Sequence, residues 1–395
     1  MNVMDSISPK IMILYASYGD GHYQASKAIE ACFHHRGVHN VVLIDLMALA
    51  HPLINNLTRF IYIQSFRTLP AVYGWVYNIT KDMQPDKPFA NILHSFGMRK
   101  LEEMIREHEP DLIIHTFPQL AMPKLMKKTG LSLPIVNIVT DFDLHGRWIH
   151  PDIDRYYVAT EDLRLEGMER GIPAERIIAT GIPIKPDFDQ THQPDPEVIQ
   201  HLDPTKKTVL LMAGAYGVMQ GIRDIIQPLL DSPNLQVIAI CGKNTELERG
   251  LKSMFGGHPG LQVYGFVHQV ARLMQICDCI ITKPGGITLS EALASRLPVF
   301  LYRPVPGQER NNALYLESKG IASISYDPKT LTGQIKSLFA GEEQLEEWKL
   351  KIDALRKPNS AERIVGDILE MWFSTDARTT TWAPSDTRPL PVGAH

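Results

Sequence analysis

The feature that most constrains the fold is an alternation of short apolar runs with amphipathic segments, which occurs twice along the chain. Residues 10–16 and 208–212, for example, are apolar runs of strand length, each followed by a glycine-containing loop and a segment of helical character. Strands that alternate with helices form right-handed βαβ units and parallel sheets. The sequence therefore predicts an α/β protein.

Each half of the chain offers strand candidates for a sheet of its own. In the first half they lie at residues 10–16, 41–45, 112–115, 135–140, 155–158 and 177–180. In the second half they lie at residues 208–212, 236–240, 263–264, 279–282, 298–302 and 322–325. Helices are expected at 219–230, 246–254, 270–276, 288–295, 312–319, 343–356 and 361–372. We therefore expect two Rossmann-like domains whose parallel sheets face each other across a ligand-binding cleft.

A cluster of prolines and polar residues between positions 183 and 204 marks the expected connection between these domains. The segment after residue 374 is rich in Thr, Pro and Asp, a composition typical of disorder. The predicted boundaries are 1–185 for the first domain, 186–205 for the linker, 206–358 for the second domain, 359–373 for a C-terminal helix and 374–395 for a disordered tail.

Charge and cysteine content exclude several classes of protein. The formal net charge of -4 argues against a nucleic-acid binder. Cys277 and Cys279 form a C-x-C pair without the second pair that a zinc site needs, so no metal is expected. The N-terminus lacks the basic and apolar regions of a signal peptide, and no apolar run reaches the length of a membrane span. We therefore expect a cytoplasmic protein.

The loop after the first strand, residues 17–22, contains a candidate catalytic group. Glycines 19 and 21 allow a sharp turn close to a ligand, and His22 falls in the first turn of the following helix. The positive end of the helix dipole disfavours a charged imidazole there, and a neutral imidazole can act as a general base. The loop alone fits a glycine turn with a capping histidine equally well.

Glycine loops also follow the strands of the second half. One contains Gly214 and Gly217, and a second places Lys243 where it could meet a phosphate or a ribose. Such loops before a helix bind anions through free backbone N–H groups.

The most informative segment is 282–291, in which two glycines precede a helix that carries a carboxylate. Gly285 and Gly286 with Thr288 suit a diphosphate, and Glu291 could accept both hydroxyls of a ribose. After the next strand, Gln308, Glu309 and Asn312 could bind sugar hydroxyls. Together these loops, at the ends of successive strands, indicate a nucleotide-sugar site.

These segments, taken in order, resemble those of a known family. The chain is similar to the monogalactosyldiacylglycerol synthases and processive diacylglycerol glucosyltransferases (glycosyltransferase family 28), within a group that includes the peptidoglycan GlcNAc transferase. The resemblance spans roughly residues 10–372 and rests on the segments at 16–25, 115–118, 139–143, 181–184, 265–267, 283–286, 290–291 and 306–309. One departure is His115, to which we assign only a structural role.

The resemblance implies a GT-B fold and an inverting transfer of a hexose from a UDP-sugar to the sn-3 hydroxyl of diacylglycerol, without a metal or other cofactor. It implies that His22 is the base, or part of the base system, that deprotonates the acceptor. The remaining implied roles are diphosphate binding by Gly214, Gly217, Gly285, Gly286 and Thr288, uracil binding by Phe266 and Val267, ribose binding by Glu291, and donor-sugar binding by Gln308 and Glu309.

Asp141 is a second candidate for the base, or for a group that orients the acceptor or an anionic lipid. The segment 141–143 also fits the D-x-D pattern of metal-dependent glycosyltransferases. Because 152–154 and 187–189 fit the same pattern, we give this interpretation little weight and expect no metal.

Residues 51–101 form an aromatic and basic segment, with six Lys or Arg against two Asp, inside an acidic chain. Aromatic rings beside cations suit the surface of an anionic membrane. An insertion packed on the first domain, with a solvated basic face, is the alternative. With the family resemblance we expect this segment to bind the membrane and the acceptor, which would place the protein peripherally on the inner face of the cell membrane.

Three functional alternatives remain open from the sequence. The donor could be UDP-glucose, as in the bacterial members of the family, or UDP-galactose, as in the plastid members, and the absence of a transit peptide favours glucose. A UDP-sugar 2-epimerase shares the two-domain fold but has no use for the segment 51–101. A catalytically silent UDP-sugar sensor would not need His22 and Glu291 together.

Overall fold

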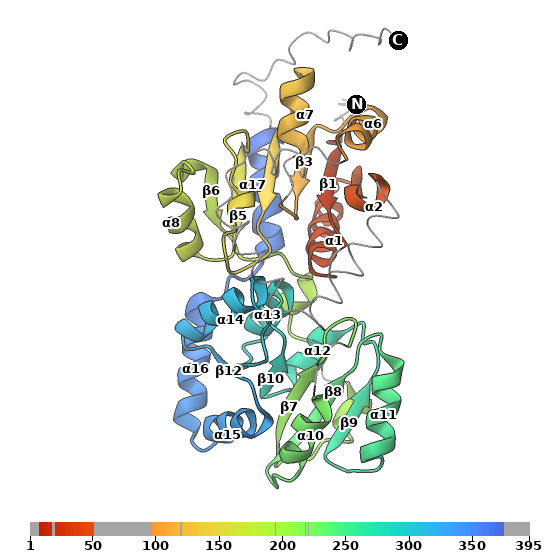
Figure 1. Cartoon of the computed structure of the whole chain (residues 1–395), viewed down its shortest axis with the longest axis vertical. Coiled ribbons are helices and arrows are strands. Elements are labelled where there is room, and N and C mark those ends of the chain that lie inside the picture. Colours follow the sequence, from red (N-terminus) through yellow and green to blue (C-terminus); the bar gives the residue numbers. More distant parts are fainter. Residues whose placement is uncertain are drawn as a thin grey trace, which may run out of the picture.

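The computed structural model consists of two α/β domains, one above the other in Figure 1. It describes residues 8–17, 20–50, 97–118, 121–193, 195–217, 219 and 221–374. Most of the predicted membrane-binding segment 51–101 and of the predicted tail 374–395 lies outside these residues.

The first domain is built on a parallel sheet. In the described residues it has six strands in the order β2-β1-β3-β4-β5-β6. Their bounds are Ile11–Tyr15 for β1, Val41–Asp45 for β2, Leu112–His115 for β3, Ile135–Ile138 for β4, Arg155–Val158 for β5 and Ile177–Ala179 for β6. Every neighbouring pair is parallel.

The second domain repeats this architecture. Its sheet also has six parallel strands over the described part of the chain, in the order β12-β11-β10-β7-β8-β9. Their bounds are Lys207–Met212 for β7, Leu235–Ile240 for β8, Leu261–Tyr264 for β9, Cys279–Thr282 for β10, Val299–Tyr302 for β11 and Ala322–Ser325 for β12. The central strands are buried on both faces, as expected of parallel sheets covered by helices.

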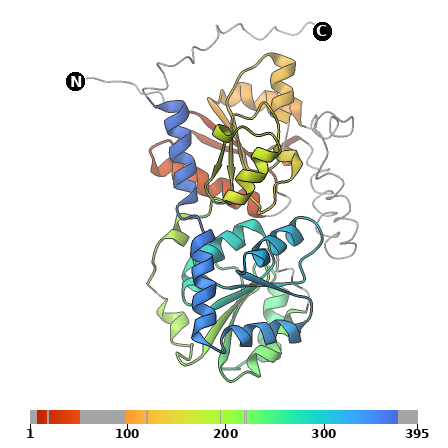
Figure 2. The ribbon, with the colours of Figure 1, turned by 90° about the vertical axis from the view of Figure 1, so that its left-hand side faces the viewer.

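The helices of the first domain are α1 (Asp20–His35), α2 (Leu46–Ala50), α6 (Met98–His108), α7 (Ala121–Thr129) and α8 (Glu161–Glu169), and α9 (Pro196–Ile199) lies in the connection between the domains. Those of the second are α10 (Ile222–Leu230), α11 (Thr245–Phe255), α12 (Val270–Gln275), α13 (Gly286–Ala294), α14 (Gln308–Ser318), α15 (Pro328–Leu338) and α16 (Glu342–Leu355). The last helix, α17 (Ser360–Phe373), follows α16 and returns to the first domain (Figure 2).

Helix α17 is part of the first domain's core. Ile364, Val365 and Ile368 are fully buried in one cluster with Ile13 and Phe33 of β1 and α1. The side chain of Asp367 accepts hydrogen bonds from Arg155, and the chain therefore crosses between the domains a second time.

The predicted α/β fold of two Rossmann-like domains is confirmed, and the predicted strands match those of the structure to within a few residues. Two helix predictions were inaccurate. Helix α10 begins at Ile222, because Gly221 before it has a left-handed backbone (φ 68°). Helix α14 begins at Gln308 and not at Asn312, directly after Gly307 (φ 97°). Helix α15 was not predicted, although the Asp327 side chain caps it and Pro328 opens it.

Candidate active site

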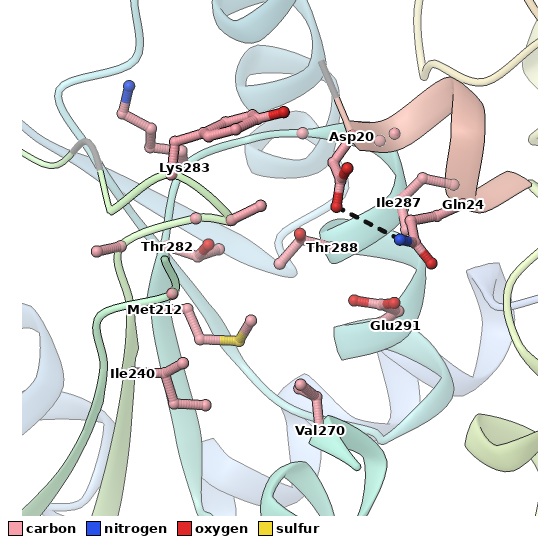
Figure 3. Close-up of a pocket in the computed structure, with 18 of the residues that line it drawn as sticks. Asp20, Gln24, Met212, Ile240, Val270, Thr282, Lys283, Ile287, Thr288 and Glu291 are labelled. Carbon is pink, nitrogen blue, oxygen red and sulfur yellow. Dashed lines mark hydrogen bonds between the residues drawn. The ribbon is translucent and has the colours of Figure 1, made fainter. Parts of the chain in front are cut away.

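A cavity of about 390 Å³ lies between the two domains, at the carboxyl ends of both sheets. Figure 3 shows Asp20 and Gln24 of α1 on one side and Thr288 and Glu291 of α13 on the other. The first turns of two helices from different domains thus meet in this cavity. Helix N-termini carry partial positive charge, so the arrangement favours an anionic ligand.

His22 lines this cavity from the third position of α1, and its Nδ1 is turned into the protein. Nδ1 lies 2.7 Å from the carbonyl oxygen of Thr116 and 3.0 Å from the Thr140 hydroxyl. A carbonyl only accepts hydrogen bonds, so Nδ1 carries the proton and Nε2 is left as the basic nitrogen. The ring also contacts Phe117 edge-on, with 5.1 Å between the centroids.

The surroundings keep this imidazole neutral. Burial lowers the pKa of His22, while the Asp141 carboxylate and the Thr116 carbonyl oppose that shift. A neutral imidazole with a fixed tautomer and a free Nε2 is the form that accepts a proton from a substrate hydroxyl.

Asp141 follows β4 in the first domain and is bound by the second. Its Oδ1 accepts hydrogen bonds from Gln308 Nε2 at 2.5 Å and from Asn312 Nδ2 at 3.2 Å, both from α14. Burial raises the pKa of Asp141, and the two amide contacts and His22 oppose that shift. Asp141 also lines the cavity, so both candidate bases face the same space.

Gln308 and Glu309 occupy the first turn of α14 at the cavity wall. The Glu309 carboxylate lies 3.9 Å from the Lys283 ammonium and accepts a hydrogen bond from the backbone N–H of Val305. Burial raises the pKa of Glu309, and Lys283 opposes the shift. An amide, a carboxylate and an ammonium together can bind several hydroxyls of one sugar.

Glu291 projects from the second turn of α13 toward the cavity (Figure 3). Burial raises the pKa of Glu291 to about 8, and the positive charge of Lys185 opposes the shift. Without a ligand this carboxyl is therefore largely protonated at neutral pH, when it both donates and accepts hydrogen bonds.

The other end of the cavity is apolar, with Met212, Ile240 and Val270 along its wall (Figure 3). Phe266 and Val267 line the same cavity, and the Phe266 side chain is 46% exposed. An apolar pocket beyond a carboxyl and a helix N-terminus has the order of groups that a nucleoside diphosphate requires: base, ribose and phosphates.

Most of the residues predicted from the sequence do line this cavity. They are His22, Asp141, Gly214, Phe266, Val267, Gly285, Gly286, Thr288, Glu291, Gln308 and Glu309. The structure thus brings together loops from positions 22 to 309 of the chain.

Three predicted binding residues lie outside the cavity lining. Asn312 is fully buried. Its amide hydrogen-bonds to Asp141, to the backbone N–H of Phe142 and to the carbonyl of Pro284. Gly217 packs against Asn244 instead. The Lys243 ammonium lies over the rings of Tyr216 and Phe266, at 5.6 Å and 5.5 Å from their centroids.

Sequence reasoning missed several residues of the cavity wall. Lys185 directly follows the 181–184 segment that was singled out, and Asp20 lies within the 17–22 loop, so both had a local signal. Gln24, Thr140 and Lys283 likewise lie in the segments 16–25, 139–143 and 283–286 that carry the resemblance. Others, such as Met212 and Val270, were expected only as parts of a strand and of a helix, and only the folded chain brings them to the site. The missed residues include Asp20, Gln24, Thr140, Lys185, Asp187, Met212, Tyr216, Val270 and Lys283.

The described residues contain neither a metal-binding cluster nor a membrane-spanning helix. No group of three or more His, Cys, Asp or Glu in this part of the chain is arranged to hold a metal ion. Over the same residues, no helix combines the length and the apolar character needed to cross a bilayer. His115 is buried and hydrogen-bonded to Asn137, and it lies outside the cavity lining.

Family models match both halves of the chain. The model described as monogalactosyldiacylglycerol (MGDG) synthase matches residues 22–184, and that of glycosyl transferases group 1 matches residues 195–352. The processive diacylglycerol beta-glucosyltransferase of Bacillus cytotoxicus is 40% identical over 92% of this chain and 94% of its own. The protein of the same name from Bacillus thuringiensis is 38% identical over the same shares.

Solved structures with the same fold have much lower sequence identity. The MnaA-UDP structure from S. aureus has a TM-score of 0.61 at 15% identity, covering 95% of this chain and 99% of its own. MurG of Acinetobacter baumannii has the same TM-score and identity, with 92% and 100% covered. At this identity the similarity shows the fold, GT-B, and nothing about the reaction.

Proposed function

Since this chain belongs to the family of monogalactosyldiacylglycerol synthases and processive diacylglycerol beta-glucosyltransferases, we propose that it transfers glucose from UDP-glucose to the sn-3 hydroxyl of diacylglycerol. The observation that carries the proposal is the cavity itself, in which His22 at the start of α1 lies together with the N-terminus of α13 and an apolar pocket. The choice of glucose rests on the names of the two Bacillus relatives.

The proposed reaction is a single displacement at the anomeric carbon. Nε2 of His22 takes the proton from the lipid hydroxyl, whose oxygen attacks C1 of the sugar from the face opposite the diphosphate. The C1–O bond to UDP breaks, its electron pair leaves with the diphosphate, and the configuration at C1 inverts from α to β. Asp141 supports the positive charge that develops on the imidazole.

The departing diphosphate would be stabilised without a metal. The backbone N–H groups at the start of α13, with the Thr288 hydroxyl, lie where the two phosphates would bind. Lys185 and Lys283 line the same cavity and add positive charge. These groups act at the position where charge accumulates in the transition state.

Glu291 would bind the ribose and Phe266 with Val267 the uracil, while Gln308 and Glu309 would bind the glucose. These assignments rest on the family resemblance and are supported by the position of all five residues in the cavity lining. The acceptor would enter from a membrane surface bound by the segment 51–101, with the enzyme peripheral on the cytoplasmic face.

The test is UDP release from UDP-glucose and from UDP-galactose, with and without diacylglycerol vesicles, together with thin-layer chromatography of the lipids. We expect UDP release from UDP-glucose that depends on the vesicles and coincides with a new glycolipid. Lipid-dependent UDP release from UDP-galactose alone would show that the donor is UDP-galactose and not UDP-glucose, and would support the same type of transfer. Conversion of a UDP-sugar without lipid would favour a 2-epimerase and contradict the proposal.

A further inference from the structure

The contacts around Asp141 connect the two domains at the catalytic base. Asp141 and His22 belong to the first domain, whereas both amides that bind Asp141 come from α14 of the second. Among the described residues, no other hydrogen bond ends on the Asp141 carboxylate.

The orientation of one of these amides is fixed by its other contacts. Asn312 Oδ1 accepts the backbone N–H of Phe142 at 2.8 Å, and that N–H can only donate. Asn312 Nδ2 also donates to the carbonyl of Pro284 at 3.0 Å. The NH₂ group therefore faces Asp141, and it contributes a donor to the carboxylate whatever the protonation state of Asp141.

A donor pair on one carboxylate oxygen favours the ionised acid over the neutral one. The amides of α14 thus oppose the burial that would otherwise protonate Asp141. A negative charge on Asp141 in turn supports a proton on His22, which lies close enough to interact with it electrostatically.

We propose that Gln308 and Asn312 are positioning residues for the catalytic base: by hydrogen bonding to Asp141 across the domain interface, they keep its carboxylate ionised and so hold His22 at the basicity that the transfer requires. This role rests on the proposed function, because only in a glycosyl transfer is His22 the catalytic base. Its consequence is that His22 becomes an effective base only when the domains are closed.

Other charged groups also face this part of the cavity and have to be included. Asp143 lies next to Asp141 and raises its pKa, and its carboxylate accepts a hydrogen bond from Asn311 at 3.0 Å. The remaining charged side chains of the cavity wall are Asp20, Lys185, Asp187, Lys283, Glu291 and Glu309. None of them changes in the variants below, so a change at His22 reports on Asp141.

The test is a titration of His22 by NMR in the free enzyme, with ¹³C-labelled histidine and the His22→Ala spectrum to assign the signal. Asp141→Asn removes the negative charge and serves as the reference. We expect it to lower the midpoint of the His22 titration by on the order of one pH unit. We expect Gln308→Leu to lower the midpoint in the same direction, and Asn312→Leu to do so as well. Tyr315→Phe, which removes an α14 contact to Asp162, is the matched control and should leave the His22 midpoint unchanged.

A merely structural role predicts the opposite sign. If Gln308→Leu only loosened the domain interface, His22 would become more hydrated and its midpoint would rise, because burial is what lowers it. A rise or no change in Gln308→Leu, or no effect of Asp141→Asn, would overturn the inference. Should Asn312→Leu fail to fold, Gln308→Leu decides alone, since among the described residues the Gln308 side chain hydrogen-bonds only to Asp141.

The titration needs no substrate, so its outcome is separate from that of the vesicle assay. A lowered His22 midpoint in Gln308→Leu, together with no glycosyl transfer by the wild type, would contradict the proposed function. It would still support the effect of α14 on His22. In an active enzyme, the acid limb of the kcat/KM profile, which reports the free enzyme, should move to lower pH for Gln308→Leu by the same amount as the titration.

Discussion

At the scale of single residues, the roles proposed for His22 and Glu291 lead to different predictions. The Thr116 carbonyl fixes the His22 tautomer. Because His22 would act only by accepting a proton, it should contribute to the chemical step and not to nucleotide binding. We therefore expect His22→Ala to lower kcat by about 10²–10⁴-fold while UDP binds with nearly unchanged affinity. Calorimetric titration with UDP beside the turnover assay checks this. Loss of both binding and turnover would contradict the role of His22 as base.

Glu291 gives the stability of the enzyme a defined pH dependence. Its pKa of about 8 is higher than in an unfolded chain, so its contribution to stability is present below about pH 4.5 and is lost as pH rises through 8. Glu291→Gln cannot ionise and should avoid this loss. At pH 8.5 we expect the variant to have a higher Tm than the wild type, by roughly 2–4 °C for each ~1 kcal/mol of unfolding free energy gained. At pH 5.5 this Tm difference should be smaller.

The exposed Glu343→Gln serves as the control for that comparison, since it lies outside the cavity. A Tm difference between Glu291→Gln and the wild type that is the same at both pH values would show that the Glu291 carboxyl does not titrate in this range. Donor binding by Glu291→Gln can be measured in the same samples.

At the scale of elements, the start of α13 packs tightly against the first domain. A Cβ on Gly286 would lie 2.1 Å from the carbonyl oxygen of Thr140, the residue whose hydroxyl contacts His22. A Cβ on Gly285 would have no neighbour within 4 Å. Gly286 therefore permits a contact that no other residue type allows without a shift of the domains.

This difference gives a pair of matched variants. Gly286→Ala should displace Thr140, separate the domains and lower kcat by more than about tenfold, with a larger radius of gyration in solution scattering. Gly285→Ala should fold with wild-type compactness and change mainly the KM for the donor. Equal effects of the two variants would contradict the close approach at Gly286.

The elements also show which parts of the site the sequence could predict. Strands β1 and β10 were evident from apolar runs, and Gly285, Gly286 and Glu291 follow directly from the β10 segment, because βα loops carry local signals. The start of α14 was missed, since Gly307 and not a polar cap precedes it. The burial of Asn312 depends on contacts with residues 142 and 284, which local spacing does not reveal.

At the scale of the whole molecule, α17 ties the end of the chain to the first domain. Arg155 makes two hydrogen bonds to Asp367, Tyr157 donates a third, and only 10% of the Arg155 side chain is exposed. Removing the partner of a buried charge is costly, so Asp367→Ala should reduce the free energy of unfolding by about 3–5 kcal/mol. Denaturant titration measures this change.

The control lies on the same helix. Glu362 pairs with Arg36 at the surface, with 33% and 47% of the two side chains exposed, and Glu362→Ala should cost less than about 1 kcal/mol. A cost for Asp367→Ala no larger than that of Glu362→Ala would mean that α17 is not anchored through Arg155.

The central claim is that the two domains together transfer glucose to a lipid with inversion. The most direct test is the structure of the lipid product, made by the purified protein from UDP-glucose and diacylglycerol vesicles and analysed by mass spectrometry and by the anomeric coupling constant in proton NMR. The account predicts a diacylglycerol that carries glucose in β linkage at the sn-3 oxygen. An α-linked product, or no glycolipid from a folded protein that binds UDP, would contradict it.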